Sequence, residues 1–220
     1  MNTVNDQPFF TSWSGGKDSC LALHRAVEDG GTPRALLTVL REDGKRTRSH
    51  GLPVSVVEAQ AASLDIPLVT FGTSWEEYEP GFISTLQDLK KQGINIGVFG
   101  DIDIDEHREW VEKVCSSAGI IPHEPLWQEE RRSLLDEFLE AEFTAAVVVV
   151  NEDVLGREML GRTLNQDLIK EFRDKGIDPS GEKGEYHTVV TDGPLFSSPV
   201  SLDIRGKVWK DGYWFLDVSC

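Results

Sequence analysis

The chain is poor in cysteine. Only Cys20, Cys115 and Cys220 occur among its 220 residues. They are far apart in the sequence and form neither a CxxC pair nor a disulfide framework. This usage argues against a disulfide-stabilised secreted domain and favours a reducing cytoplasm.

Basic residues and long apolar runs are also scarce. The chain has 22 Lys and Arg against 38 Asp and Glu, a formal net charge of −16. Because nucleic-acid binding needs clustered positive charge, this balance disfavours a nucleic-acid partner, although a local loop could still hold a nucleotide. The longest apolar run, Ala145–Val150, is too short to cross a membrane. The first eight residues lack the basic and apolar regions of a signal peptide, so we expect a cytoplasmic protein with no membrane partner.

The most informative stretch is a Gly-Gly turn between two different patterns. Residues 8–13 are rich in aromatic and hydroxyl side chains and predict a strand. Cys20, Leu23 and Val27 follow at helical spacing. A glycine turn between a strand and a helix offers backbone N–H groups and a helix N-terminus to an anion. The sequence therefore predicts a phosphate-binding loop over residues 14–19.

This loop differs from a Walker A loop, which has four residues between its first glycine and the Gly-Lys-Ser/Thr ending. Here Gly15 and Gly16 are adjacent, and Asp18 follows Lys17. The tighter turn suits an anion of pyrophosphate size, and the carboxylate of Asp18 could hold magnesium. A surface turn with two charges is the alternative, which the strand–turn–helix context disfavours.

Strands alternate with helices through the first half of the chain. Predicted strands cover residues 34–40, 66–71 and 95–100, and predicted helices cover 54–64, 75–92 (broken near Pro80–Gly81) and 106–118. This alternation predicts an α/β fold with a doubly wound, mostly parallel sheet. Ligands of such sheets bind at the carboxyl ends of the strands, where Ser14, Thr38 and Asp101 lie. Residues 1–124 are therefore predicted to form the nucleotide-binding domain.

The second half predicts a smaller α+β domain over residues 125–220. Helices are expected at 129–141 and 166–175, a buried strand at 143–150, and further strands near 186–191, 200–209 and 213–218. The turn Lys210-Asp211-Gly212 predicts a hairpin between the last two strands.

Three further clusters could carry chemistry. Asp101, after Gly100, could hold magnesium or a substrate donor, or could simply cap a helix. His50, in Ser49-His50-Gly51, could equally belong to an ordinary helix entry. Residues 181–188 hold two glutamates around a glycine, which could line a pocket for a cation or a metal-bound pyrophosphate, or form a solvated turn. Trp127 and Tyr186 could add aromatic walls for a cation, or could be core residues.

Taken in order, these motifs resemble the diphthine–ammonia ligase family of PP-loop ATP pyrophosphatases (HUP type). The resemblance spans roughly residues 9–200. It rests on Ser-Gly-Gly-Lys-Asp-Ser at 14–19, Gly-Asp at 100–101, Pro-Leu-Trp at 125–127, Leu-Gly-Arg-Thr-Leu at 160–164 and Gly-Glu-x-Gly-Glu-Tyr at 181–186. One position departs from the family pattern, because eukaryotic members have an acidic residue where this chain has His187.

The resemblance implies an ATP-dependent, AMP-forming ligase. Such an enzyme adenylates a carboxylate, releases pyrophosphate, and lets ammonia displace AMP to give an amide. In this family the acceptor is diphthine on elongation factor 2, and Mg²⁺ accompanies ATP. Residues 125–220 would then bind the acceptor and complete the active-site cleft. The resemblance does not decide between a monomer and a homodimer.

The resemblance also assigns roles to residues. Lys17 and Asp18 would be catalytic, with Asp18 also the metal ligand. Residues expected to bind ATP are Ser14, Gly15, Gly16, Lys17, Asp18, Ser19, Thr38, His50 and Gly51. Residues expected to bind the acceptor are Asp101, Trp127, Glu182, Gly184, Glu185 and Tyr186.

Two other functions stay open from the residues alone. One is a tRNA-modifying enzyme of the thiolation type in the same superfamily, which the acidic balance and the lack of paired cysteines disfavour. The other is a non-catalytic ATP or AMP sensor, because a fold by itself does not fix an activity.

Overall fold

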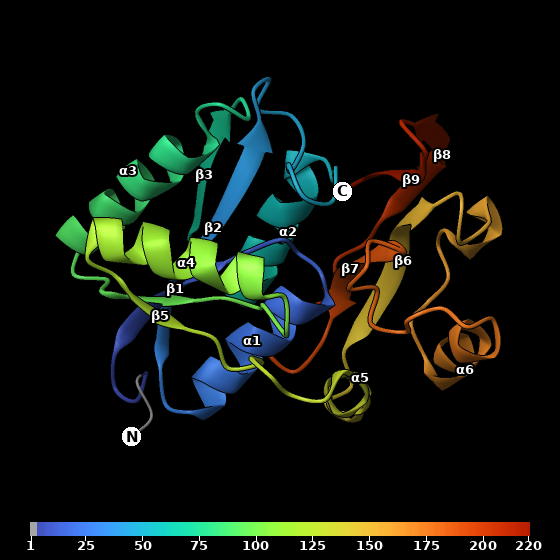
Figure 1. Cartoon of the computed structure of the whole chain (residues 1–220), viewed down its shortest axis with the longest axis horizontal. Helices are drawn as coiled ribbons and strands as arrows, with labels where there is room; N and C mark the ends of the chain where they lie inside the picture. The colour runs from blue at the N-terminus through green and yellow to red at the C-terminus, as the bar shows by residue number, and fades with distance from the viewer. Residues whose placement is uncertain (1–3) are drawn as a thin grey trace. The chain divides into compact units, whose positions relative to one another are not determined.

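The computed structural model of the chain describes residues 4–220 (Figure 1). Its internal contacts divide the chain into two compact units. Unit 1 contains the chain up to Ser14 together with residues 18–49 and 65–129, and unit 2 contains residues 15–17, 50–64 and 130–220. Within the described residues, no helix is both long enough and apolar enough to cross a membrane.

Unit 1 is built on a parallel sheet with strand order β3-β2-β1-β4-β5. Its strands are β1 (Pro8–Ser12), β2 (Thr32–Arg41), β3 (Leu68–Thr73), β4 (Ile96–Val98) and β5 (Ile121–His123). The prediction of a doubly wound α/β fold is confirmed. The strand β5 was missed, because three residues around Pro122 are too short to show an alternating pattern.

Helices cover both faces of this sheet. Phe9 and Phe10 are fully buried neighbours on β1, and side chains of neighbouring strand residues point to opposite faces. On the face of Phe9 lies α1 (Lys17–Glu28), since a Cβ placed on Gly31 would meet both Phe9 and the carbonyl of Ala26. On the face of Phe10 lie α3 (Tyr78–Lys91) and α4 (Asp105–Ala118).

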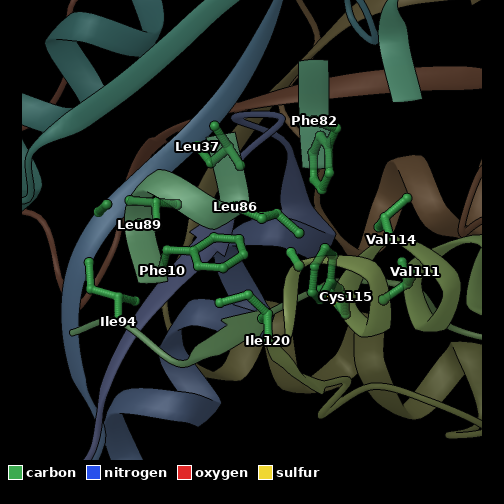
Figure 2. Packing of buried hydrophobic residues seen from close by; sticks show 13 residues of the cluster. Phe10, Leu37, Phe82, Leu86, Leu89, Ile94, Val111, Val114, Cys115 and Ile120 are labelled. Carbon is green, nitrogen blue, oxygen red and sulfur yellow. The ribbon is translucent and has the colours of Figure 1, made fainter. Parts of the chain in front are cut away.

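The core on the Phe10 face is contributed by the sheet and both helices. Figure 2 shows its side chains converging, among them Phe10 and Leu37 from the sheet, Leu86 from α3 and Val114 from α4. Leu86 and Val114 are fully buried. Each such side chain contributes about 1.5–3 kcal/mol by leaving water. This packing fixes the strands whose carboxyl ends carry the predicted site.

The helix α3 corrects one expectation. The prediction of a helix broken near Pro80–Gly81 is wrong, since α3 begins at Tyr78 and runs on through both residues. Pro80 stands in the first turn, where a missing N–H costs no intrahelical hydrogen bond. The N–H of Gly81 already reaches the carbonyl of Glu77 at 3.0 Å.

Unit 2 is built on an antiparallel sheet with strand order β7-β6-β9-β8. Its strands are β6 (Thr144–Asn151), β7 (Tyr186–Asp192), β8 (Asp203–Lys210) and β9 (Tyr213–Ser219), and its helices are α2 (Val54–Leu64), α5 (Arg131–Glu140), the 3₁₀ turn η1 (Arg157–Met159) and α6 (Gln166–Asp174). The predicted hairpin is confirmed: Lys210 pairs with Tyr213 across Asp211 and Gly212, both at positive φ. The smaller α+β part is likewise confirmed.

Candidate active site

In unit 1 the predicted site residues gather at the carboxyl edge of the sheet. Ser14 comes shortly after β1, and Gly100 and Asp101 come shortly after β4. β1 and β4 are neighbours, and the strand order reverses between them. Such a reversal is the place where open α/β sheets bind their ligands.

The first turn of α1 and the loop after β4 pack closely together. A Cβ built on Gly100 would lie 2.8 Å from the carbonyl carbon of Asp18 and 2.9 Å from its oxygen. Only glycine allows this approach without a backbone shift. Within the same turn, the hydroxyls of Ser14 and Ser19 lie 3.1 Å apart. The hydroxyls of Ser14 and Ser19 therefore lie together at the start of the helix, whose second residue is Asp18.

Thr38 has a local structural partner. Its buried hydroxyl donates a hydrogen bond of 2.7 Å to the carbonyl of Trp13. The N–H of Trp13 donates to the carbonyl of Leu37 at 2.8 Å. These bonds extend the pairing of β1 with β2 up to the predicted phosphate-binding loop. An adenine-binding role for Thr38 stays a prediction.

Asp101 and Trp127 belong to neighbouring loops of unit 1. Oδ1 of Asp101 lies 3.3 Å from Nδ1 of His107. The N–H of Gln128 donates to the carbonyl of Ile102 at 2.6 Å and so ties the two loops together. The guanidinium of Arg108 lies over the indole of Trp127, 4.8 Å from the ring centre.

In unit 2 the central tripeptide of the loop, Gly15–Lys17, is held by α2 and β7. Nε2 of Gln60 donates to the carbonyl of Gly15 at 3.0 Å and to that of Val190 at 2.7 Å. The N–H of Val190 also donates to the carbonyl of Gly15, at 2.9 Å. The N–H of Lys17 donates to the hydroxyl of Thr188 at 3.1 Å. Two elements far away in the sequence thus fix the conformation of the loop.

The side chain of Lys17 is almost fully buried and has an acidic partner. Its Nζ lies 3.6 Å from Oε1 of Glu182, and the two side chains are 8% and 16% exposed. A buried ammonium group needs such a partner, because removing its charge from water is costly. The structure therefore brings together two predicted residues that are 165 positions apart.

His50 lies against Gly16 and stacks on His187. A Cβ on Gly16 would come within 2.5 Å of Cε1 of His50. Nδ1 of His50 donates to the carbonyl of Thr188 at 3.1 Å, and the two imidazole rings stack with centroids 4.6 Å apart. Burial lowers the pKa of both rings, that of His187 to about 4, and the charge of Lys17 lowers both further. Both imidazoles are therefore neutral near pH 7.

The remaining predicted residues of unit 2 have local structural roles. Oε2 of Glu185 accepts a hydrogen bond of 2.9 Å from the N–H of Lys183. Tyr186 is buried against Phe172, and its hydroxyl donates to the carbonyl of Pro179 at 2.5 Å. Gly184 adopts a φ of 79° and Gly51 one of 64°, conformations that favour glycine. Direct acceptor contacts by Glu185 and Tyr186 stay predictions.

Sequence reasoning missed Gln60 and gave Thr188 no role of its own. Gln60 is fully buried, and its only signal was a lone amide in the apolar helix α2. Thr188 lies inside a predicted strand, where a hydroxyl has no distinctive pattern.

Family models cover nearly the whole chain. Residues 9–122 match the diphthamide synthase N-terminal domain, and residues 130–219 match the diphthamide synthase C-terminal domain. The chain belongs to the diphthamide synthase family. The resemblance that the ordered motifs predicted is thereby confirmed.

Curated members of the diphthamide synthase family are similar along most of the chain. The diphthine–ammonia ligase of Rattus norvegicus is 28% identical over 94% of this chain and 86% of its own length. That of Homo sapiens is 27% identical over 86% of this chain and 80% of its own. That of Schizosaccharomyces pombe is 29% identical over 86% of this chain but 35% of its own.

A solved structure, described as a predicted subunit of tRNA methyltransferase from Methanocaldococcus jannaschii, aligns with 86% of this chain and 98% of its own. Its identity of 15% and TM-score of 0.45 are too low to support a functional comparison.

Proposed function

We propose that this protein is an ATP-dependent ligase that forms an amide, with diphthine on elongation factor 2 as the acceptor and ammonia as the nitrogen donor. The observation that carries the proposal is the family match over both parts of the chain. The phosphate-binding loop supports it, because the loop stands at the reversal of the strand order and carries a buried lysine. The reaction adenylates a carboxylate, releases pyrophosphate, and replaces AMP by nitrogen.

The loop residues would bind and orient the triphosphate. The N–H groups of the turn and the start of α1 favour anions. The buried ammonium of Lys17 would exchange Glu182 for a phosphate oxygen as negative charge develops on the leaving pyrophosphate. The bonds from Gln60, Val190 and Thr188 hold the turn in place before ATP binds. Such preorganisation avoids the energetic cost of reorganising the loop during the reaction.

Magnesium fits the donor set at the start of α1. A carboxylate and two hydroxyls are oxygen ligands, the kind that Mg²⁺ prefers, and Mg²⁺ in nucleotide sites takes few protein ligands and several phosphate oxygens. Within residues 4–220 no group of three or more His, Cys, Asp or Glu side chains could hold a metal by itself. Asp18, with Ser14 and Ser19, would hold the ion, which when bound would neutralise charge on the phosphates.

The two alternatives are not favoured. Neither a tRNA-modifying enzyme nor a non-catalytic sensor is the function named for the curated relatives. The net charge of −16 also opposes tight binding of tRNA at physiological salt.

The decisive experiment supplies ATP, magnesium, ammonium chloride and diphthine-bearing elongation factor 2, and measures the products. AMP and pyrophosphate should form in equal amounts with the amide. We expect Lys17→Ala and Asp18→Asn to lower kcat/KM at least about a hundredfold, as the loss of charge stabilisation in a transition state does. Lys183→Ala, at an exposed lysine, is the matched control. Formation of ADP, or full activity of both loop variants, would overturn the proposal.

A further inference from the structure

Glu124 is a buried carboxyl group at the carboxyl edge of the unit 1 sheet. It directly follows β5, the neighbour of β4, whose own loop carries Asp101. The side chain of Glu124 is 8% exposed. Its Oε2 lies 3.7 Å from Nε of Arg108, whereas its Oε1 has no hydrogen-bond partner among the described residues. A buried carboxylate oxygen without a donor is costly, and therefore points to a missing ligand.

The surroundings of Glu124 are held firmly. Nη1 of Arg25, on α1, donates to the carbonyl of Pro125 at 2.7 Å. On the other side, the N–H of Gln128 binds the carbonyl of Ile102. The loop after β5 is thus attached both to the phosphate-binding helix and to the loop of Asp101. The loop of Asp101 also packs against α1, because Gly100 lies against the backbone of Asp18. The loop of Glu124 is therefore connected to the first turn of α1.

The charges around Glu124 favour a cation. From the β4 loop comes the carboxylate of Asp101, and from α4 come the guanidinium of Arg108 and the carboxylate of Glu112. Burial, followed by the charge of Asp101, raises the pKa of Glu124 to about 7. Arg108 offsets only one of the three carboxylate charges, those of Glu124, Asp101 and Glu112, so the site keeps a net negative charge that favours a cation. The free Oε1 additionally calls for a hydrogen-bond donor.

We infer that Glu124, together with Asp101, forms the binding site for the ammonium ion that supplies the amide nitrogen. This inference rests on the proposed function for the fate of the ion, but the site itself can be tested by binding alone. Ammonium is the substrate of that reaction that is small, monovalent and a hydrogen-bond donor. Trp127, whose buried indole N–H also has no partner within residues 4–220, lies beside Arg108 at the same site.

The proton balance of the reaction gives Glu124 a defined role. At neutral pH the nitrogen arrives as ammonium, which has no lone pair for attack. One N–H proton passes to the carboxylate of Glu124 and leaves ammonia. The nitrogen lone pair then forms the C–N bond with the acyl carbon, and the bond from that carbon to the AMP oxygen breaks with its electron pair. A second proton leaves the nitrogen for water, so the acyl adenylate and ammonium give amide, AMP and two protons. A base with a pKa near the working pH is suited to this step.

A carboxyl titration of the full chain tests the site without any turnover. The Glu124 signal in ¹³C NMR is assigned by its loss in Glu124→Gln, and its titration midpoint is measured in sodium, potassium and ammonium chloride at one ionic strength. Ammonium should lower the midpoint by about half a unit or more, because a bound cation favours the carboxylate. Potassium carries the same charge but no N–H donors, and should leave the midpoint where sodium does. Equal midpoints in all three salts would overturn the inference, and so would an equal shift with potassium.

Kinetics provide the second arm. In the ligase assay, Glu124→Gln can neither pair with ammonium nor accept its proton. It should raise the apparent KM for ammonium about tenfold or more and also lower kcat, while the Kd for ATP is unchanged. Asp101→Asn should act in the same direction and serves if Glu124→Gln fails to fold. Glu109→Gln, an exposed glutamate of α4, is the matched control. Ammonium binding without AMP formation would overturn the proposed function but not the ammonium site. Normal ammonium kinetics in both variants would overturn the ammonium site alone.

Discussion

At the scale of single residues, the stacked imidazoles of His50 and His187 make stability depend on pH. Their pKa values are lowered in the folded protein, so the unfolded chain binds more protons once the pH falls below about 6.5. Stability is therefore fully present above that pH and is lost as the pH falls towards 4. Lys17, the cation that faces both rings, increases the effect because it repels their protonated forms.

His187→Phe keeps an aromatic ring and removes one titrating group. We expect the loss of thermal stability between pH 6.5 and 4.5 to be smaller in this variant than in the parent chain. The measurement is the melting temperature across that range, compared between this variant and the parent chain. Parallel pH profiles for His187→Phe and the parent would contradict the explanation.

Gln60 is the residue through which α2 holds the predicted phosphate-binding loop. Gln60→Leu keeps the volume but removes two hydrogen bonds from the carbonyls of Gly15 and Val190. Leaving buried acceptors short of donors costs about 1–3 kcal/mol of stability. ATP affinity, measured by calorimetry, should also fall, because the loop is no longer held in its binding conformation. Gln87→Leu, on the exposed side of α3, should change neither quantity, and unchanged ATP affinity in Gln60→Leu would refute the positioning role.

The residues of the loop could be predicted from sequence, but their partners could not. Residues 14–19 form a local pattern whose chemistry follows from adjacent side chains. Thr188 and Glu182 contact Lys17 from more than 160 positions away. No local periodicity reports such a pairing, since it depends on how β7 and its preceding loop pack.

At the scale of elements, the close packing of α1 against the loop after β4 depends on one glycine. In Gly100→Ala the new methyl group would lie 2.8 Å from backbone atoms of Asp18, so the first turn of α1 must move. Overpacking of this kind costs about 1–3 kcal/mol. We expect a lower free energy of unfolding and weaker ATP binding, measured by denaturant titration and calorimetry.

The control is Gly206→Ala on β8, where an added Cβ meets nothing within 4 Å. That variant should change neither stability nor ATP affinity appreciably. If Gly100→Ala had the same stability and ATP affinity as Gly206→Ala, the close approach of Gly100 to Asp18 would be needed for neither property.

The hydrophobic pattern of the sequence predicted whether a segment is a helix or a strand better than it predicted where the segment begins and ends. The apolar run at 54–64 predicted α2 with the bounds it has. The prediction at 75–92 placed the start of α3 too early, because Pro80 was taken as a break rather than as a first-turn residue. β5 was missed because its edge position allows a very short strand.

At the scale of the whole molecule, the predicted division at residues 124 and 125 stays a prediction, and the contacts make it testable. Unit 2 draws residues 15–17 and 50–64 from the first half of the chain. A fragment of residues 125–220 would lack α2, whose Gln60 and Ser63 bind the carbonyls of Val190 and Ser198.

We therefore expect the fragment of residues 125–220 to melt at a lower temperature and less cooperatively than the intact chain. Adding the fragment of residues 1–124 should raise that temperature, because it restores those buried hydrogen bonds. Circular dichroism at several mixing ratios checks this. A fragment of residues 125–220 that melts identically alone and in the mixture would show an independent domain.

The sequence by itself determined the strand–turn–helix pattern around residues 14–19, the α/β alternation, the hairpin at Asp211–Gly212 and the family. Each of these depends on residues that are close together along the chain or on motifs in a fixed order. Only the tertiary structure decided which side chains hold the loop and which carboxyl group is buried without a donor. Hydrogen bonding and burial depend on distances in space, and folding brings Gln60, Val190 and Glu124 into their surroundings through elements that are remote in sequence.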